Sequence, residues 1–303
     1  MDSLVKASGW ASALRAIHDA MNNKTLHFIY VAMTAPFLAL SLMADEDTKY
    51  TTVTGQVVYC NDATKLKPLF LKGDSVKDAA ICSAEDMPDE RLIVDAKTQG
   101  VSNVFVWFEK IEQDSIHPDL ANEQLTPPNL LFEGCRIEPH ALCVQTRTGM
   151  RVTTSDSILH NPHDHPQRNT ASCVALPANL RGDNLDGFIH NFSVSEPFPM
   201  TITCDYHPWM CSYVLVQNHP YMTVTKADGS FSIEKVPSGT HRLQIWHELA
   251  GRLFREKVTL NSRLHDIGKV EMKISPEVMS SLRFVKVEAV DPTTGASKES
   301  ESR

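Results

Sequence analysis

From residue 50 onward, short runs of β-branched and aromatic residues alternate with turn residues, a pattern typical of β-sandwiches and barrels. Residues 109–129 show no helical period and carry the Pro127-Pro128 pair, so we expect a surface loop there. The strands that the pattern predicts before residue 219 are 54–59, 92–95, 102–108, 141–145, 151–154, 187–194, 200–204 and 212–217.

After His219 the pattern becomes a regular β-meander, with strands expected at 221–225, 230–233, 241–247 and 253–260. Asp228-Gly229 separates two of these strands and favours a tight hairpin, because glycine accepts the positive φ of such a turn. We therefore expect an all-β chain with a large sandwich over residues 50–218 and a small β module over 219–290. The tail 291–303 is rich in Ser, Thr and charges and is expected to be disordered.

One long apolar run, residues 25–44, lies near the N-terminus and is followed by Asp45-Glu46-Asp47. Such a run is typical of an export signal or a membrane anchor, so residues 1–49 are expected to be an N-terminal extension. Lys24 lies just before the run, which makes Met21 an alternative start to Met1. Cleavage after Ala44 and a retained anchor both remain open, and a buried core helix is the third interpretation.

Net charge and cysteine content narrow the possible partners. The 303-residue chain has a formal net charge of -8 and no Lys/Arg-rich run interleaved with aromatic residues, so nucleic-acid binding has little support. If Cys204 is set aside as a metal ligand, six of the seven cysteines remain. They could form three bridges in fifteen ways, which the sequence cannot choose among, or remain as buried thiols.

Residues 201–213 read T-I-T-C-D-Y-H-P-W-M-C-S-Y and place Cys204, His207 and Met210 at even three-residue steps. A thiolate, an imidazole and a thioether on one short loop suit copper, because thiolate and thioether favour Cu(I) while imidazole serves Cu(I) and Cu(II). One further imidazole would complete a His2Cys site with a weak axial methionine.

Candidates for that imidazole lie in S-D-S-I-L-H-N-P-H-D-H, residues 155–165, which open a long polar connection to residue 186. His160 directly follows Ile158-Leu159, which would anchor it against the core. His163 and His165 follow Pro162, which restricts the preceding residue to extended conformations and is expected to carry the chain away from the strand end. They remain alternative ligands, a second exposed metal patch or a solvated loop.

A His-Asn pair followed by C-x-x-H-P-x-M after about forty residues resembles the blue copper proteins, or cupredoxins, with the short ligand loop of amicyanin. The resemblance implies a copper ion held by His160, Cys204, His207 and Met210. It also implies that Asn161 ties the two ligand loops together by hydrogen bonding. The wider family implies that the edge of His207, framed by Pro208 and Trp209, is the exposed port for the electron.

Further motifs resemble bacterial cupredoxin-like proteins that continue into a carboxypeptidase-regulatory-like module. This resemblance implies a Greek-key cupredoxin-like sandwich over residues 50–218 and a prealbumin-like sandwich over 219–290. It favours a disulfide between Cys82 and Cys135. The motifs are V-T-G-Q-V-V-Y at 53–59, G-C-R-I-E-P-H at 134–140, H-P-Y-M-T-V-T-K-A-D-G-S-F-S-I at 219–233 and I-W-H-E at 245–248.

These observations predict an exported, periplasmic or cell-surface type 1 copper protein that carries single electrons between small redox proteins and is not an enzyme. The alternative is a cell-surface structural or binding protein in which copper is absent or stored. Structural zinc is disfavoured by the thioether of Met210. A catalytic Cys204 with His207 as base would need an orienting Asn or Asp that the sequence does not reveal.

Overall fold

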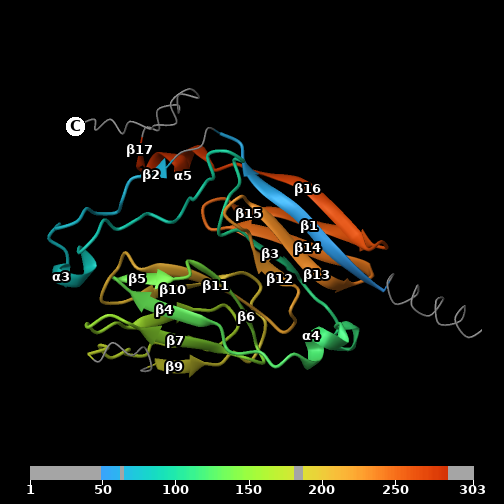
Figure 1. Ribbon diagram of the computed structural model, residues 1–303, viewed down its shortest axis with the longest axis horizontal. Helices are drawn as coiled ribbons and strands as arrows, with labels where there is room; N and C mark the ends of the chain where they lie inside the picture. The colour runs from blue at the N-terminus through green and yellow to red at the C-terminus, as the bar shows by residue number, and fades with distance from the viewer. Residues whose placement is uncertain (1–48, 62–64, 181–186, 286–303) are drawn as a thin grey trace, which may run out of the picture. The chain divides into compact units, whose positions relative to one another are not determined.

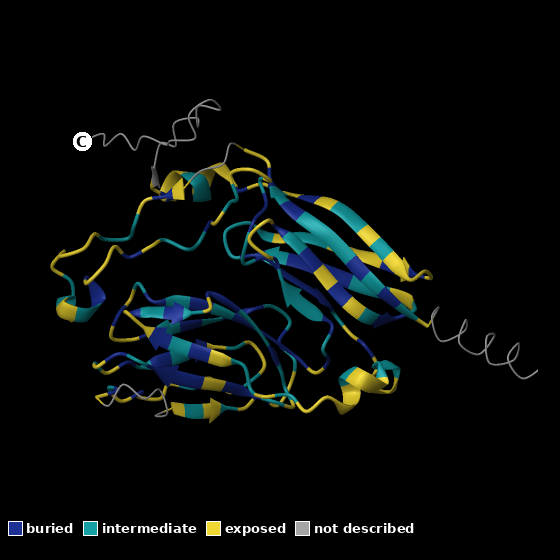
Figure 2. Cartoon of the chain, viewed as in Figure 1, coloured by how far each residue is buried: buried dark blue, intermediate teal, exposed yellow. Residues whose placement is uncertain are grey.

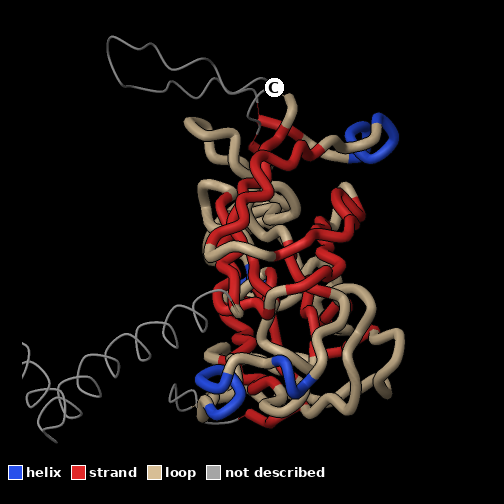
Figure 3. Tube along the Cα trace, turned by 90° about the vertical axis from the view of Figure 1, so that its right-hand side faces the viewer, coloured by secondary structure: helices blue, strands red, loops and turns tan. Residues whose placement is uncertain are grey.

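The computed structural model describes residues 49–61, 65–180 and 187–285. Within those ranges strands and loops make up nearly all of the chain and the helices are short (Figure 3), so the prediction of an all-β fold is confirmed. None of the helices described in these ranges is long and apolar enough to span a membrane. The apolar run 25–44 and the tail 291–303 lie outside the described residues.

The first sandwich, which contains the candidate metal ligands, consists of two four-stranded sheets with the orders β5-β4-β7-β9 and β6-β11-β10-β8. The pairs β4–β7 and β6–β11 are parallel, and the other neighbours are antiparallel. The strands are β4 (Asn129–Glu133), β5 (Arg136–Glu138), β6 (Ala141–Gln145), β7 (Met150–Thr154), β8 (Pro162–His165), β9 (Gly187–His190), β10 (Met200–Cys204) and β11 (Cys211–Gln217).

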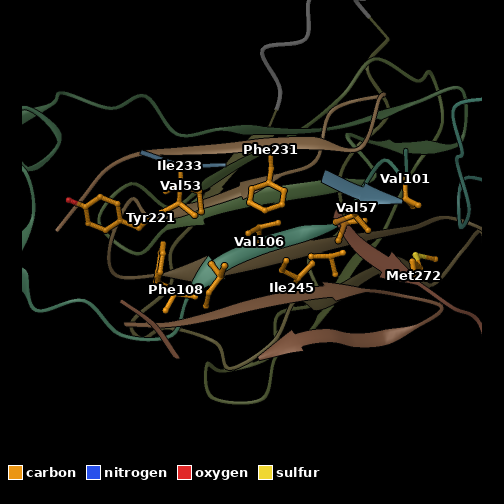
Figure 4. Close-up of a cluster of buried hydrophobic side chains, with 14 of the residues drawn as sticks. Val53, Val57, Val101, Val106, Phe108, Tyr221, Phe231, Ile233, Ile245 and Met272 are labelled. Carbon is orange, nitrogen blue, oxygen red and sulfur yellow. The ribbon is translucent and has the colours of Figure 1, made fainter. Parts of the chain in front are cut away.

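The second sandwich pairs the sheet β13-β1-β16 with the sheet β12-β3-β14-β15 (Figure 1). Its core includes Val53, Val106, Phe231 and Ile245, which come from both sheets and point into one cluster (Figure 4). The strands are β1 (Tyr50–Tyr59), β3 (Phe105–Phe108), β12 (Met222–Val224), β13 (Ser230–Pro237), β14 (Gly239–His247), β15 (Gly251–Leu260) and β16 (Leu264–Met272).

This strand pairing divides the chain differently from the expected boundary between residues 218 and 219. Strand β1 is the central strand between β13 and β16, and β3 lies between β12 and β14. The N-terminal strands β1 and β3 therefore belong to the C-terminal sandwich. The first sandwich is formed by the part of the chain that lies between β3 and β12. Sequence periodicity identifies a strand but does not say which partner it pairs with, because hydrogen bonding between strands depends on contacts distant in the sequence.

Strand β3 shows why the two sandwiches pack against each other. All four of its residues are buried, whereas β1 alternates between buried and less buried positions (Figure 2). Val106 and Phe108 point into the core of the second sandwich, and Phe105 and Trp107 join a separate cluster with Leu215 of β11. Successive side chains of a strand point to opposite faces, so β3 has an apolar neighbour on each face.

The turn predicted at Asp228-Gly229 is present, but the expected hairpin is not, because β12 pairs with β3 and β13 pairs with β1 in the other sheet. Gly229 has φ of 77° and donates its N–H to the carbonyl of Lys226 at 2.9 Å. A Cβ added at Gly229 would lie 2.3 Å from the carbonyl oxygen of Val57. The turn therefore needs glycine both for its positive φ and for its close approach to β1.

Several predicted elements differ in the structure. Residues 92–95 contribute a single bridge, Val94 to Val101, rather than a strand. The expected loop 109–129 contains two short helical turns, and β4, β5, β8 and β16 were not predicted. The remaining elements are β2 (Lys65–Leu66), α3 (Ala79–Cys82), η1 (Gln113–Ser115), α4 (Pro118–Asn122), α5 (Pro276–Ser281) and β17 (Phe284–Val285).

Candidate metal centre

A tight turn joins β10 to β11 and presents three of the predicted ligands. Thr203 pairs with Cys211, which closes the hairpin at the point where the turn begins. The N–H of His207 donates to the carbonyl of Cys204 at 3.3 Å, and the N–H of Met210 donates to the carbonyl of His207 at 3.0 Å. Cys204, His207 and Met210 are 2%, 0% and 1% exposed, so the three-residue spacing brings all three into the core.

The remote histidine reaches the same place from the other predicted segment. His160 forms an isolated β-bridge with Leu176, with backbone bonds of 3.1 and 2.9 Å in both directions, and its side chain is fully buried. Its Nδ1 lies 3.8 Å from the Sγ of Cys204. The Nδ1 of His207 lies 3.6 Å from the same sulfur. The structure thus brings the two predicted imidazoles to one thiol.

These separations can be tested against the geometry of a single bound ion. A thiolate and an imidazole bound to one tetrahedral ion, at bond lengths of about 2.3 and 2.0 Å, lie about 3.5 Å apart. The two nitrogen-to-sulfur distances, 3.8 and 3.6 Å, are close to this value, and one donor atom from each of His160, Cys204 and His207 lies within 4.8 Å of the others. Met210 lies in the same buried cluster as Cys204. The donor set therefore fits a copper ion.

The outward nitrogens of both imidazoles are held by carboxylates. The Nε2 of His160 lies 2.9 Å from Asp156 Oδ2, and the Nε2 of His207 lies 3.0 Å from Asp78 Oδ2. In the neutral imidazole, an Nε2–H that donates to a carboxylate fixes the ring orientation and leaves the Nδ1 lone pair for a metal. In the charged imidazolium, Nδ1 also carries a proton, which it can donate to the Cys204 thiolate. Carboxylates of this kind commonly orient metal-binding histidines and raise their basicity.

The surroundings of Cys204 favour the thiolate, which is the form that binds a metal. Burial opposes ionisation of the thiol, but hydrogen bonds from His160, the Asn161 backbone N–H and His207 outweigh it and lower the pKa of Cys204 to about 6. Burial likewise opposes a charged His160, yet its bonds to Asp156 and Cys204 raise the pKa of that imidazole. The site is thus built around an anionic sulfur.

Asn161 connects the two ligand segments. Its backbone N–H donates to the Sγ of Cys204 at 3.4 Å, and its side-chain amide donates to Asp205 Oδ2 at 3.0 Å. One residue therefore joins the segment of His160 to the turn of Cys204, which is the contact that the resemblance implied.

The expectation that the edge of His207 is exposed is wrong. Its side chain has no exposed surface, because Asp78 of the segment before α3 covers the Nε2 side. Pro208 is exposed and Trp209 is half-buried, with its ring centroid 5.4 Å from that of His207. The covering segment is distant in sequence, so the ligand loop alone could not reveal it.

The covering segment is anchored by a disulfide between Cys82 and Cys135, the pair that the resemblance favoured. Cys82 ends α3, and its backbone N–H donates to the carbonyl of Asp78 at 3.0 Å. Trp209 donates its indole N–H to the carbonyl of Cys135 at 3.2 Å. Within the described residues the free cysteines are Cys60, Cys143, Cys173, Cys204 and Cys211.

The other histidines lie outside the three-donor group of the buried centre. His163 and His165 belong to β8, which pairs with β10, so the expectation that Pro162 carries the chain away from the strands is wrong. Pro162 can occupy an edge strand because an outward-facing N–H is not needed there. His190 lies in β9 as predicted and contacts Asp164, while His140 pairs with Glu248.

The two carboxylates that orient the ligands were not predicted from the sequence. Asp156 precedes His160 by four residues, and its oxygens also accept the N–H groups of Gly134 and Cys135. Its position in S-D-S-I-L-H was a usable signal, because a short polar segment before a ligand can fold back onto it. Asp78 offered no such signal, since it lies 129 residues from His207.

No family model and no curated protein matches this chain. Part of this chain is similar to three solved structures, one of a nitrite reductase and two of amicyanin. A Cu-containing nitrite reductase from Thermus scotoductus SA-01 is 14% identical over 31% of this chain and 23% of its own length, with a TM-score of 0.25. The match therefore spans about a quarter of that reductase.

Two single-residue mutants of amicyanin also match. A Cu(I) form is 15% identical over 32% of this chain and 89% of its own length, and an oxidised form is 13% identical over 38% and 99%. Both TM-scores are 0.25. Similarities at this level carry no inference about function, which depends on the donor set itself.

Proposed function

We propose that this chain is a mononuclear type 1 copper protein that carries single electrons. The observation that supports the proposal is the buried Cys204 Sγ flanked by the Nδ1 atoms of His160 and His207 at 3.8 and 3.6 Å. Two imidazoles, a thiolate and a nearby thioether are the donor types of blue copper sites. A bound copper ion would supply the one-electron couple between Cu(II) and Cu(I).

The protein's own contribution is a rigid set of donors. Asp156 and Asp78 hold the two imidazoles by their outward nitrogens, and Asn161 donates its backbone N–H to the sulfur. Because His160, His207 and Cys204 are each held by a further contact, these donors can keep one arrangement in both oxidation states. Little reorganisation would then accompany each electron transfer.

The electron exit follows from the burial of His207. Its Nε2 bonds to Asp78, whose side chain is 38% exposed. We propose that the electron leaves through this hydrogen bond and the surface around Pro208 and Trp209, rather than from an exposed imidazole edge. Small redox proteins that dock over the segment of Asp78 are the partners this geometry suits.

We further propose that the protein is exported to the periplasm or the cell surface. The Cys82–Cys135 disulfide supports this location, because structural disulfides persist mainly in oxidising compartments. We expect no catalytic turnover, since the copper ion would be enclosed by buried side chains.

Reconstitution with Cu(II) tests the proposal directly. We expect one equivalent of copper and an intense visible band from thiolate-to-copper charge transfer. Cys204→Ser should abolish the band, whereas Cys60→Ser, which removes an exposed free thiol, should leave it intact. A folded protein that stays colourless with Cu(II) would refute the assignment.

A second candidate function is a structural or binding protein that stores copper or has none. The extended contact between the two sandwiches, made by Phe105, Trp107, Ala141 and Leu215, favours it because such packing suits a rigid surface module. In that case Cys204→Ser should change only the free energy of unfolding, with no loss of a redox wave in voltammetry.

A further inference from the structure

A second group of donor atoms lies at the surface. His163, Cys173 and Asp205 each offer one atom, and these atoms lie within 4.8 Å of one another. The Nδ1 of His163 lies 3.1 Å from Asp205 Oδ1, and the Sγ of Cys173 lies 3.3 Å from Asp205 Oδ2. The carboxylate therefore bridges the imidazole and the thiol.

The backbone holds these three residues in register. His163 forms a β-bridge with Cys173, flanked by backbone bonds from Val174 to Pro162 at 3.2 Å and from Asp164 to Ser172 at 3.0 Å. Directly opposed residues of an antiparallel pair have Cβ atoms about 4.5 to 5.5 Å apart, within reach of one ion. On its other side, β8 pairs with β10.

Asp205 joins the group from that neighbouring strand. Thr203 pairs with His163, and Asp205, two residues after Thr203, directly follows the end of β10. The donors thus come from three adjacent segments of one sheet region.

We propose that His163, Cys173 and Asp205 bind a borderline divalent cation, with Zn²⁺ as the best fit. Thiolate, imidazole and carboxylate are the three ligand types of protein zinc, whereas Mg²⁺ and Ca²⁺ bind oxygen ligands and Cu(I) favours softer sets without carboxylate. The side chains of His163 and Asp205 are 33% and 42% exposed, so water can take the fourth position.

Asn161 supports the two anionic ligands. Its side-chain amide lies 3.2 Å from the Sγ of Cys173 and 3.0 Å from Asp205 Oδ2. Once a bound metal displaces the proton that Cys173 donates to Asp205, these N–H groups would stabilise the thiolate and the carboxylate side by side, as outer hydrogen bonds commonly do at metal sites. The proposed zinc site shares no ligand with the buried donors, so it does not depend on the proposed copper function.

Cobalt(II) serves as the probe, because thiolate-bound Co²⁺ gives a near-ultraviolet charge-transfer band. The titration is made on anaerobic Cys204→Ser protein, in which the buried site no longer offers a thiolate. We expect a saturable band at one equivalent that Zn²⁺ bleaches by displacing Co²⁺. Cys173→Ser in this background should remove the band, and Asp205→Asn should weaken Co²⁺ binding by at least about tenfold.

Matched controls separate this site from other thiols and histidines. Cys60→Ser and His165→Ala, added singly to the same background, should leave the band and the affinity unchanged. A second measurement avoids the Cys204 variant: by equilibrium dialysis, Cys173→Ser alone should bind one equivalent of Co²⁺ less than the unchanged chain. Any one of three results would overturn the proposal. These are an unaltered band in the Cys173→Ser variant, unaltered Co²⁺ affinity in the Asp205→Asn variant, or equal amounts of bound cobalt in dialysis of Cys173→Ser and the unchanged chain.

Discussion

Removal of the Cys82–Cys135 disulfide should both destabilise the protein and uncover the metal centre. The two cysteines are 53 residues apart in the sequence. In the chain-entropy model, the bridge lowers the entropy of the unfolded chain by 2.1 + 1.5R ln n cal/mol/K, where n is the number of residues in the closed loop. For this loop the lost entropy corresponds to about 4 kcal/mol of stability at 25 °C. That is a large share of the roughly 5 to 15 kcal/mol by which domains are stable.

The assay is urea unfolding of the Cys82→Ala, Cys135→Ala double variant, followed by tryptophan fluorescence. We expect a loss of about 4 kcal/mol in the free energy of unfolding. Cys60→Ala, at an exposed free thiol, should change it by less than about 0.5 kcal/mol. A double variant within about 1 kcal/mol of the parent would refute the entropic argument.

The same variant should lose copper faster to a chelator. Cys82 anchors α3, and α3 begins next to Asp78, whose carboxylate covers His207. Asp78→Ala separates the two effects, because it removes the cover without opening the disulfide. We expect Asp78→Ala to speed copper removal while the urea midpoint shifts far less than in the double variant. Equal removal rates in all three proteins would show that this segment does not seal the centre.

Three further predictions concern single side chains. Met210→Gln should keep the thiolate colour but lower the reduction potential in voltammetry, because an oxygen donor favours Cu(II); an unmoved potential would mean that the thioether is not bound. His160→Ala should abolish the visible band or leave it dependent on added imidazole, while the His163→Ala, His165→Ala double variant should keep the band. The opposite result would mean that His163 or His165, and not His160, is the ligand. Burial lowers the pKa of His219 to about 4, below its unfolded value near 6.5, so the unfolded state binds more protons as the pH falls. His219 should therefore cost about 3 kcal/mol of stability between pH 7 and pH 4, and His219→Gln should show a correspondingly smaller loss over that range in urea unfolding.

Local periodicity and turn chemistry were sufficient to predict the all-β class. Strands 141–145 and 200–204 match the observed bounds, and the glycine turn after Asp228 lies where expected. Short-range signals of this kind depend on residues within a few positions of each other, which the sequence displays directly. Their partners are not displayed, and so the pairing of β1 and β3 with the C-terminal strands was not predicted.

The sequence by itself also determined the candidate donors, because Cys204, His207 and Met210 share one short turn and their side-chain chemistry points to copper. Only the tertiary structure decided that the Nδ1 atoms of His160 and His207 lie 3.8 and 3.6 Å from one sulfur. It also decided that Asp78 covers the expected port, and that His163, Cys173 and Asp205 meet at the surface. The physical reason is that contacts between distant segments depend on how sheets pair and pack, and no local pattern in a chain encodes them alone.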